Sequence, residues 1–102
     1  MSKKLVRERF RNAVFTRDRN RCAFCTETAN LDAHHITDRN EMPNGGYVAE
    51  NGISLCPTHH LAAERFHISG GGEWEPGMHP DDLYKKIGSS YELAVRKSER
   101  LK

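Results

Sequence analysis

Two short cysteine and histidine pairs constrain this 102-residue chain more than any other feature of its sequence. Two residues separate Cys22 from Cys25, and the same spacing joins Cys56 to His59. Structural zinc sites take four cysteine or histidine ligands, which short spacings of this kind supply in pairs. The sequence therefore predicts one structural Zn²⁺ ion, held by Cys22, Cys25, Cys56 and His59. The alternative is that the three cysteines are small buried thiols.

Chain length and cysteine number also favour a metal. A chain of this size buries only a small core, so a cross-link adds stability that the core alone supplies poorly. Three cysteines cannot all pair in internal disulfides, whereas three thiolates and one imidazole complete a tetrahedral zinc site. We therefore expect a single domain over residues 1–102 in which zinc is the cross-link.

A second series of polar residues lies between and beside these pairs. His34 and His35 stand together in residues 31–37, a short segment with β-branched residues that predicts a strand. Asn51 precedes a second predicted strand at residues 52–55, and His60 lies in a predicted helix over residues 57–66. Neighbouring side chains of a strand point to opposite faces. We therefore expect one histidine of the pair to bind a metal and the other to transfer protons.

The order of these residues, a histidine pair, a central asparagine and a final histidine, resembles that of the HNH endonucleases, also called His-Me or ββα-metal finger nucleases. The resemblance covers a motif core of residues 17–66. The two Cys/His pairs lie where many members carry a zinc knuckle, although the family more often has cysteine in the place of His59. The resemblance implies an α+β fold, a small ββα-metal finger flanked by an N-terminal basic helix and C-terminal helices. Residues 67–102 lie outside it.

The resemblance also implies a function, the metal-dependent hydrolysis of DNA phosphodiester bonds. Because nothing in the chain resembles a dedicated base-reading module, we expect low sequence specificity. The resemblance assigns His34 and His60 to a catalytic divalent ion, Mg²⁺ or Mn²⁺, and His35 to the general base. A free imidazole has a pKa near 6.5, which suits that task. It assigns to Asn51 the tethering of the loop between the strands. Because glycine follows Asn51, a common turn is the alternative for that residue.

Glu64 follows His60 by four residues, so both side chains lie on one face of the predicted helix. An additional metal ligand is one interpretation of Glu64, and an exposed helix glutamate is the other. Two imidazoles favour manganese and other transition metals over magnesium.

Basic charge is concentrated at the N-terminus. Residues 1–21 contain eight lysines and arginines against two acidic residues, while the remainder contains eight against twelve. This distribution suits a polyanion-binding surface, and the alternative is a solvated face of a helix predicted over residues 2–19. The candidate contacts to DNA phosphates are Arg17, Arg19, Arg21 and Arg39, although Arg39 lies in a predicted loop over residues 38–46 and could equally be solvated there.

Two further helices are predicted over residues 81–87 and 91–101. No apolar run approaches the roughly 18 residues of a membrane span, so we expect a cytoplasmic protein that binds no membrane. The expected partner is DNA. Any sequence specificity would come from a protein partner or from the C-terminal part. The competing hypothesis is a zinc-stabilised nucleic-acid-binding module without catalytic activity. The complete histidine and asparagine series favours the nuclease.

Overall fold

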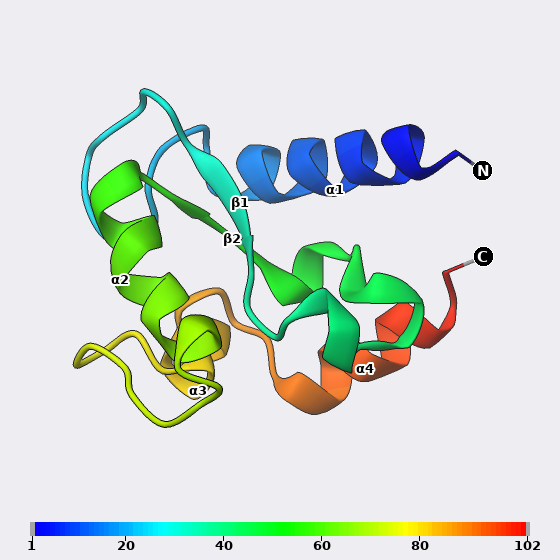
Figure 1. The fold of residues 1–102 in the computed structure, drawn as a ribbon. Coiled ribbons are helices and arrows are strands. Elements are labelled where there is room, and N and C mark those ends of the chain that lie inside the picture. The colour runs from blue at the N-terminus through cyan, green and yellow to red at the C-terminus, as the bar shows by residue number, and fades with distance from the viewer. Residues whose placement is uncertain (1, 102) are drawn as a thin grey trace.

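A two-stranded antiparallel sheet lies between the N-terminal helix and the helix that follows the second strand (Figure 1). The computed structural model describes residues 2–101, and within that range the chain is a small α+β domain. Its elements run in the order α1 (Lys3–Arg17), β1 (Asp32–His35), η1 (Arg39–Glu41), η2 (Pro43–Gly46), η3 (Ala49–Asn51), β2 (Gly52–Leu55), α2 (Pro57–Ile68), α3 (Pro80–Lys86) and α4 (Tyr91–Glu99).

The predicted strands and their antiparallel pairing are confirmed. His34 lies opposite Ile53, and His35 lies opposite Gly52. Helix α1 packs so closely on β2 that a Cβ atom at Gly52 would lie 2.5 Å from Val14 and 2.7 Å from Phe10. Only glycine fits this approach, and it brings α1 against the sheet beside the histidine pair.

Helix α1 begins and ends at local signals. The Ser2 hydroxyl accepts a hydrogen bond from the Leu5 N–H at 3.2 Å, which caps the first turn. Arg19 and Asn20 both have positive φ angles, 60° and 56°, which a helix does not allow. The helix therefore ends at Arg17, two residues before the predicted end, and the chain turns back toward Cys22.

The loop between the strands contains tight turns rather than extended chain. Its residues Asn44, Gly45 and Gly46 have φ angles of 52°, 82° and 66°, as expected for turn-forming residues. A Cβ atom at Gly46 would lie 2.6 Å from the Asn51 amide nitrogen. Glycine is thus required where this loop meets Asn51.

The C-terminal helices complete the same core. Leu83 and Tyr84 of α3 and Ala94 of α4 are buried in the cluster that also contains Ile36, which follows β1, and Ile53 and Leu55 of β2. The Asn44 amide donates to the carbonyl oxygens of Ser98 and Leu101 at 2.9 and 3.0 Å, which holds the end of α4 to η2. Helix α3 begins one residue before the predicted start and ends one residue early, and α4 ends two residues before the predicted end.

Candidate functional site

The four predicted zinc ligands come together at the start of α2. Cys22 and Cys25 lie on the turn after α1, and Cys56 and His59 lie at the N-terminus of α2. Their ligand atoms all lie within 4.8 Å of one another. The Cys25 and Cys56 sulfurs are 3.8 Å apart, and His59 Nδ1 lies 3.5 Å from Cys22 Sγ and 3.2 Å from Cys56 Sγ.

These distances fit a tetrahedral zinc ion. Zn–S bonds of about 2.3 Å and Zn–N bonds of about 2.0–2.1 Å require S···S separations of about 3.8 Å and S···N separations of about 3.6 Å. Burial raises the pKa of the Cys22 thiol, but N–H groups of Cys56 and Phe24 outweigh it and lower that pKa below the usual 9.0. The Cys56 pKa is lowered mainly by the His59 N–H. A backbone hydrogen bond lowers the pKa of the Cys25 thiol, but burial and the two other cysteines outweigh it and raise that pKa. The site therefore favours thiolates at Cys22 and Cys56 and could hold a structural metal such as zinc.

A second cluster joins β1 to α2. Glu64 Oε1 lies 3.1 Å from His34 Nδ1 and 3.4 Å from His60 Nε2, and the three ligand atoms could share one ion. Burial lowers the pKa of His34, and the hydrogen bond to His34 lowers the pKa of Glu64 to about 2. At neutral pH the cluster thus contains a neutral imidazole and a carboxylate, the forms that bind metals. Glu64 belongs to this cluster and is not a fully exposed helix residue.

Two residues beside the cluster were not among the predicted site residues. Asp32 Oδ2 lies 3.3 Å from His60 Nδ1, so Nδ1–H can donate to this carboxylate. In that tautomer Nε2 carries the free lone pair, on the side of Glu64. The His67 ring stacks on His34, with 5.2 Å between ring centroids. The spacings could have revealed both, because Asp32 shares a strand face with His34 and His67 follows His60 by two helical turns.

His35 lies on the other face of β1. Its ring stacks on Phe10 with 4.5 Å between centroids and meets Tyr47 edge to face at 4.9 Å. His67 Nε2 donates to the His35 carbonyl oxygen at 2.9 Å, while His35 Nε2 is buried with no hydrogen-bond partner among the described residues. Burial, with the charges of neighbouring residues, lowers the pKa of His35 to about 4. The pKa of His35 thus lies below that of a free imidazole, and the ring is neutral at pH 7.

One cavity is lined by both histidines of the pair, His34 and His35. It has a volume of about 280 Å³, and its lining includes His34, His35, His60, Glu64 and Arg39. The residues that surround this cavity thus include the three-residue cluster and His35.

Asn51 is fully buried and uses its whole side chain as a tether. Its Oδ1 accepts from the Thr37 N–H at 3.0 Å and from the Tyr84 hydroxyl at 2.7 Å. Its Nδ2 donates to the carbonyl oxygens of Thr37 and Gly46 at 3.1 and 3.2 Å. The two ends of the loop after β1 are therefore held together, and a simple turn role does not account for the residue.

The four candidate DNA-binding arginines have different positions. The Arg17 guanidinium donates to the carbonyl oxygens of Ala49 and Gly52, both at 2.7 Å, and pairs with Asp18 at 2.8 Å. This side chain therefore connects α1 to β2 and is occupied within the fold. Arg19 and Arg21 are exposed on the turn before the Cys/His cluster, and the exposed Arg39 lines the histidine cavity.

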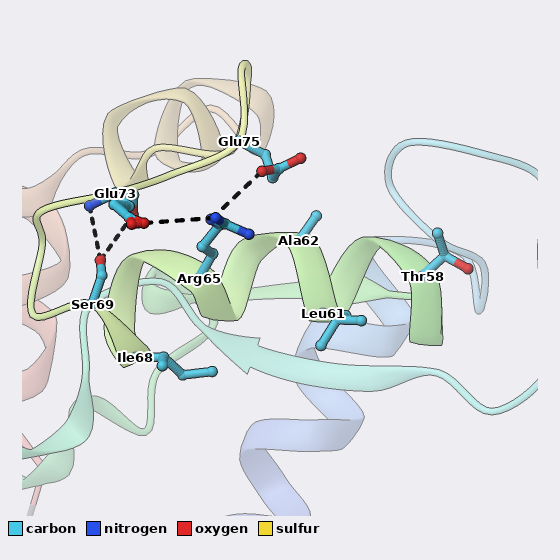
Figure 2. Close-up of a pocket in the computed structure, with 8 residues that line it drawn as sticks. All are labelled: Thr58, Leu61, Ala62, Arg65, Ile68, Ser69, Glu73 and Glu75. Carbon is cyan, nitrogen blue, oxygen red and sulfur yellow. Dashed lines mark hydrogen bonds and ion pairs between the residues drawn. The ribbon is translucent and has the colours of Figure 1, made fainter.

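A larger hollow, of about 720 Å³, is lined by residues of α2 and of the loop that follows it. Figure 2 shows these side chains. Arg65 lies there between Glu73 and Glu75, at 3.6 and 3.7 Å from their carboxylates. Leu61 and Ile68 flank it and are 72% and 78% exposed. The residues that line this hollow include no histidine or cysteine, so it belongs to neither cluster.

Comparisons with protein-family models, curated proteins and solved structures give no match to the chain. The likeness to HNH endonucleases accordingly stays a prediction from the residues named above. No helix in the described part of the chain is both long and apolar enough to cross a membrane.

Proposed function

We propose that the chain is a metal-dependent DNA endonuclease of the HNH type, with His35 as its general base. The observation that most supports this is that one cavity contains two kinds of group. His34, His60 and Glu64 offer three ligand atoms within reach of one ion, and His35 offers a neutral imidazole. Hydrolysis of a phosphodiester uses both, because the phosphate needs charge neutralisation and the attacking water must lose a proton.

The ligand set suits a catalytic ion. Three protein ligands leave open positions for water and substrate, and two imidazoles with one carboxylate suit Mn²⁺ and other transition metals better than Mg²⁺. When bound, such an ion would polarise a phosphate oxygen and stabilise the leaving oxygen. In the chain itself, Asp32 would hold the His60 ring so that its Nε2 faces the ion.

Several contacts would hold His35 in position for proton transfer. Phe10 fixes the plane of its ring, and His67 holds its carbonyl oxygen. Asn51 holds Thr37, two residues further on, at both its N–H and its carbonyl. A base held in this way loses little freedom when the substrate binds, which favours catalysis.

The Cys/His cluster would hold a separate structural zinc ion. His59 belongs to that cluster, and the next residue, His60, belongs to the other. Zinc at the start of α2 would therefore fix the helix that presents His60 and Glu64. A plain zinc-stabilised binding module needs the first cluster alone and gives the second no role.

Nicking of supercoiled plasmid tests this proposal. The zinc-loaded chain is incubated with and without Mn²⁺ or Mg²⁺, beside His35→Ala and a control variant, His79→Asn. The control changes a histidine outside the cavity and keeps an acceptor at the start of α3. We expect metal-dependent nicking that falls about 100-fold or more in His35→Ala and is unchanged in the control, since a general base contributes on that order.

Retention of zinc and DNA binding by His35→Ala would show that the variant still folds. If wild-type protein binds DNA but never cleaves it with any divalent metal, the binding module becomes the better hypothesis. If His35→Ala cleaves at the wild-type rate, His35 is not the base.

A further inference from the structure

A cationic groove lies beside the histidine cavity, between the start of α1 and the loop that contains η1 and η2. It has a volume of about 390 Å³. The residues that line it include three cations, two amides and a phenol, and no carboxylate. The polar members are Lys3, Arg7, Arg39, Asn40, Asn44 and Tyr47.

Two arginines and one tyrosine line the same part of the molecule in this groove. Arg39 Nη1 donates to the Tyr47 hydroxyl at 3.4 Å. Arg39 and the nearby Arg7 together lower the pKa of this phenol, Arg39 more strongly. Both arginines are exposed, and in residues 2–101 no carboxylate lies within ion-pair distance of either. Neither guanidinium is therefore held in an ion pair within the described residues, in contrast to that of Arg17.

The groove and the cavity are neighbours that share one lining residue, Arg39. The ring of Tyr47 packs against His35 at 4.9 Å, while its hydroxyl accepts from Arg39 on the groove side. A DNA strand with one phosphate in the cavity would therefore pass Arg39, and its next phosphates would lie along Arg7 and Lys3.

We propose that Lys3, Arg7 and Arg39 form a phosphate-binding track for the DNA strand on one side of the cleaved bond. This inference deepens the proposed nuclease function and rests on it. Arginine and lysine bind phosphates without reading bases, so the track would fix the position and direction of the strand but not its sequence. DNA is favoured over an acidic peptide because the groove shares Arg39 with the cavity that would bind a phosphodiester.

The salt dependence of DNA binding measures the track separately from cleavage. We would titrate a labelled 20-base-pair duplex with zinc-loaded His35→Ala protein, which binds without cutting, from low to moderate salt. Each lost phosphate contact lowers the slope of log Kd against log salt by about 0.9 for a duplex and about 0.7 for a single strand. We expect the slope to fall by the amount for one contact in Arg7→Gln, and by about twice that amount in the double variant Arg7→Gln with Arg39→Gln.

Arg11→Gln is the matched control, because it removes the same charge from the same helix outside the groove. An unchanged slope in Arg11→Gln supports the track, and an equal fall in Arg11→Gln overturns it, since net charge would then explain the effect. Tyr47→Phe removes the hydroxyl that accepts from Arg39, so it should weaken DNA binding. It keeps the ring against His35, so the fold should be retained.

Cleavage by otherwise wild-type protein distinguishes the two proposals. If that protein nicks plasmid and Arg7→Gln with Arg39→Gln leaves both the slope and the KM unchanged, the track is wrong while the nuclease stands. If a polyglutamate peptide displaces the duplex and the arginine substitutions weaken only the peptide, the groove binds acidic protein and the track is also wrong. If no cleavage occurs but the slope falls as expected, the groove binds DNA and the nuclease proposal fails.

Discussion

The Tyr84 hydroxyl donates a hydrogen bond to Asn51 Oδ1 at 2.7 Å, which connects α3 to the residue that ties the loop after β1. Because the single hydroxyl proton of Tyr84 is used there, Thr37 Oγ1 must donate to the Tyr84 oxygen, at 2.6 Å. Burial raises the pKa of Tyr84 to about 12, so this donor keeps its proton. The C-terminal part of the chain thus takes part in positioning the segment that follows His35.

Tyr84→Phe should destabilise the protein by about 1–3 kcal/mol, because buried acceptor and donor groups of Asn51 and Thr37 lose their partner. Chemical denaturation of the zinc-loaded protein measures this change. Tyr91→Phe is the control, since Tyr91 is 46% exposed and its substitution should stay within about 0.5 kcal/mol. Equal stability of the two variants would mean that the Tyr84 hydroxyl does not support Asn51.

The elements near the metal clusters could be predicted because their signals are short in range. The spacings of Cys22 to Cys25 and of Cys56 to His59 are local, and residue type alone indicates a metal. The alternation along β1 predicted that His34 and His35 face opposite sides, and their contacts with α2 and α1 agree with this.

Contacts between distant segments could not be predicted in the same way. Nothing near Tyr84 in the sequence indicates that its hydroxyl reaches Asn51, 33 residues away. Arg17 belongs to a basic segment by composition, yet its guanidinium turns inward to two carbonyl oxygens of the segment that leads into β2. Glu64 was ambiguous because an i, i+4 spacing identifies a shared face but not what that face contacts.

His59→Ala should lose zinc and unfold, whereas His59→Cys should keep both zinc and fold. Alanine removes one of four ligands, and the free energy of zinc binding in small domains is on the order of 10 kcal/mol. Cysteine supplies a thiolate at the same position, which completes a four-cysteine site. Zinc content by metal analysis and helix content by circular dichroism check both variants. Zinc retained by His59→Ala would remove His59 from the ligand set.

Asp18→Asn should destabilise the protein by about 1–3 kcal/mol at neutral pH, because Asp18 accepts from Arg17 and from the Ser54 N–H at 2.8 Å. Burial raises the pKa of Asp18, but these donors outweigh it and leave the pKa below 3.8. A lowered pKa stabilises the folded state above the unfolded pKa, and this contribution disappears as the pH falls through the folded pKa.

The difference in unfolding free energy between wild type and Asp18→Asn should therefore be constant from pH 8 to about pH 5 and shrink below about pH 4. Comparing the two proteins at each pH cancels the protonation of the other groups. A difference that grows as the pH falls would contradict the assigned direction of the pKa.

Glu64→Gln should weaken Mn²⁺ binding without loss of zinc, because it replaces the carboxylate that His34 and His60 share by a neutral amide. Asp32→Asn should also weaken binding, by about 10-fold to 100-fold, since such partners orient a ligating histidine. Calorimetric titration of the zinc-loaded protein with Mn²⁺ measures both. Glu92→Gln, on the first turn of α4, is the control for the charge change in Glu64→Gln. Since the two clusters use separate residues, simultaneous loss of zinc and Mn²⁺ in Glu64→Gln would indicate general unfolding. Loss of Mn²⁺ alone would identify Glu64 as a ligand, and unchanged Mn²⁺ affinity would contradict the assignment.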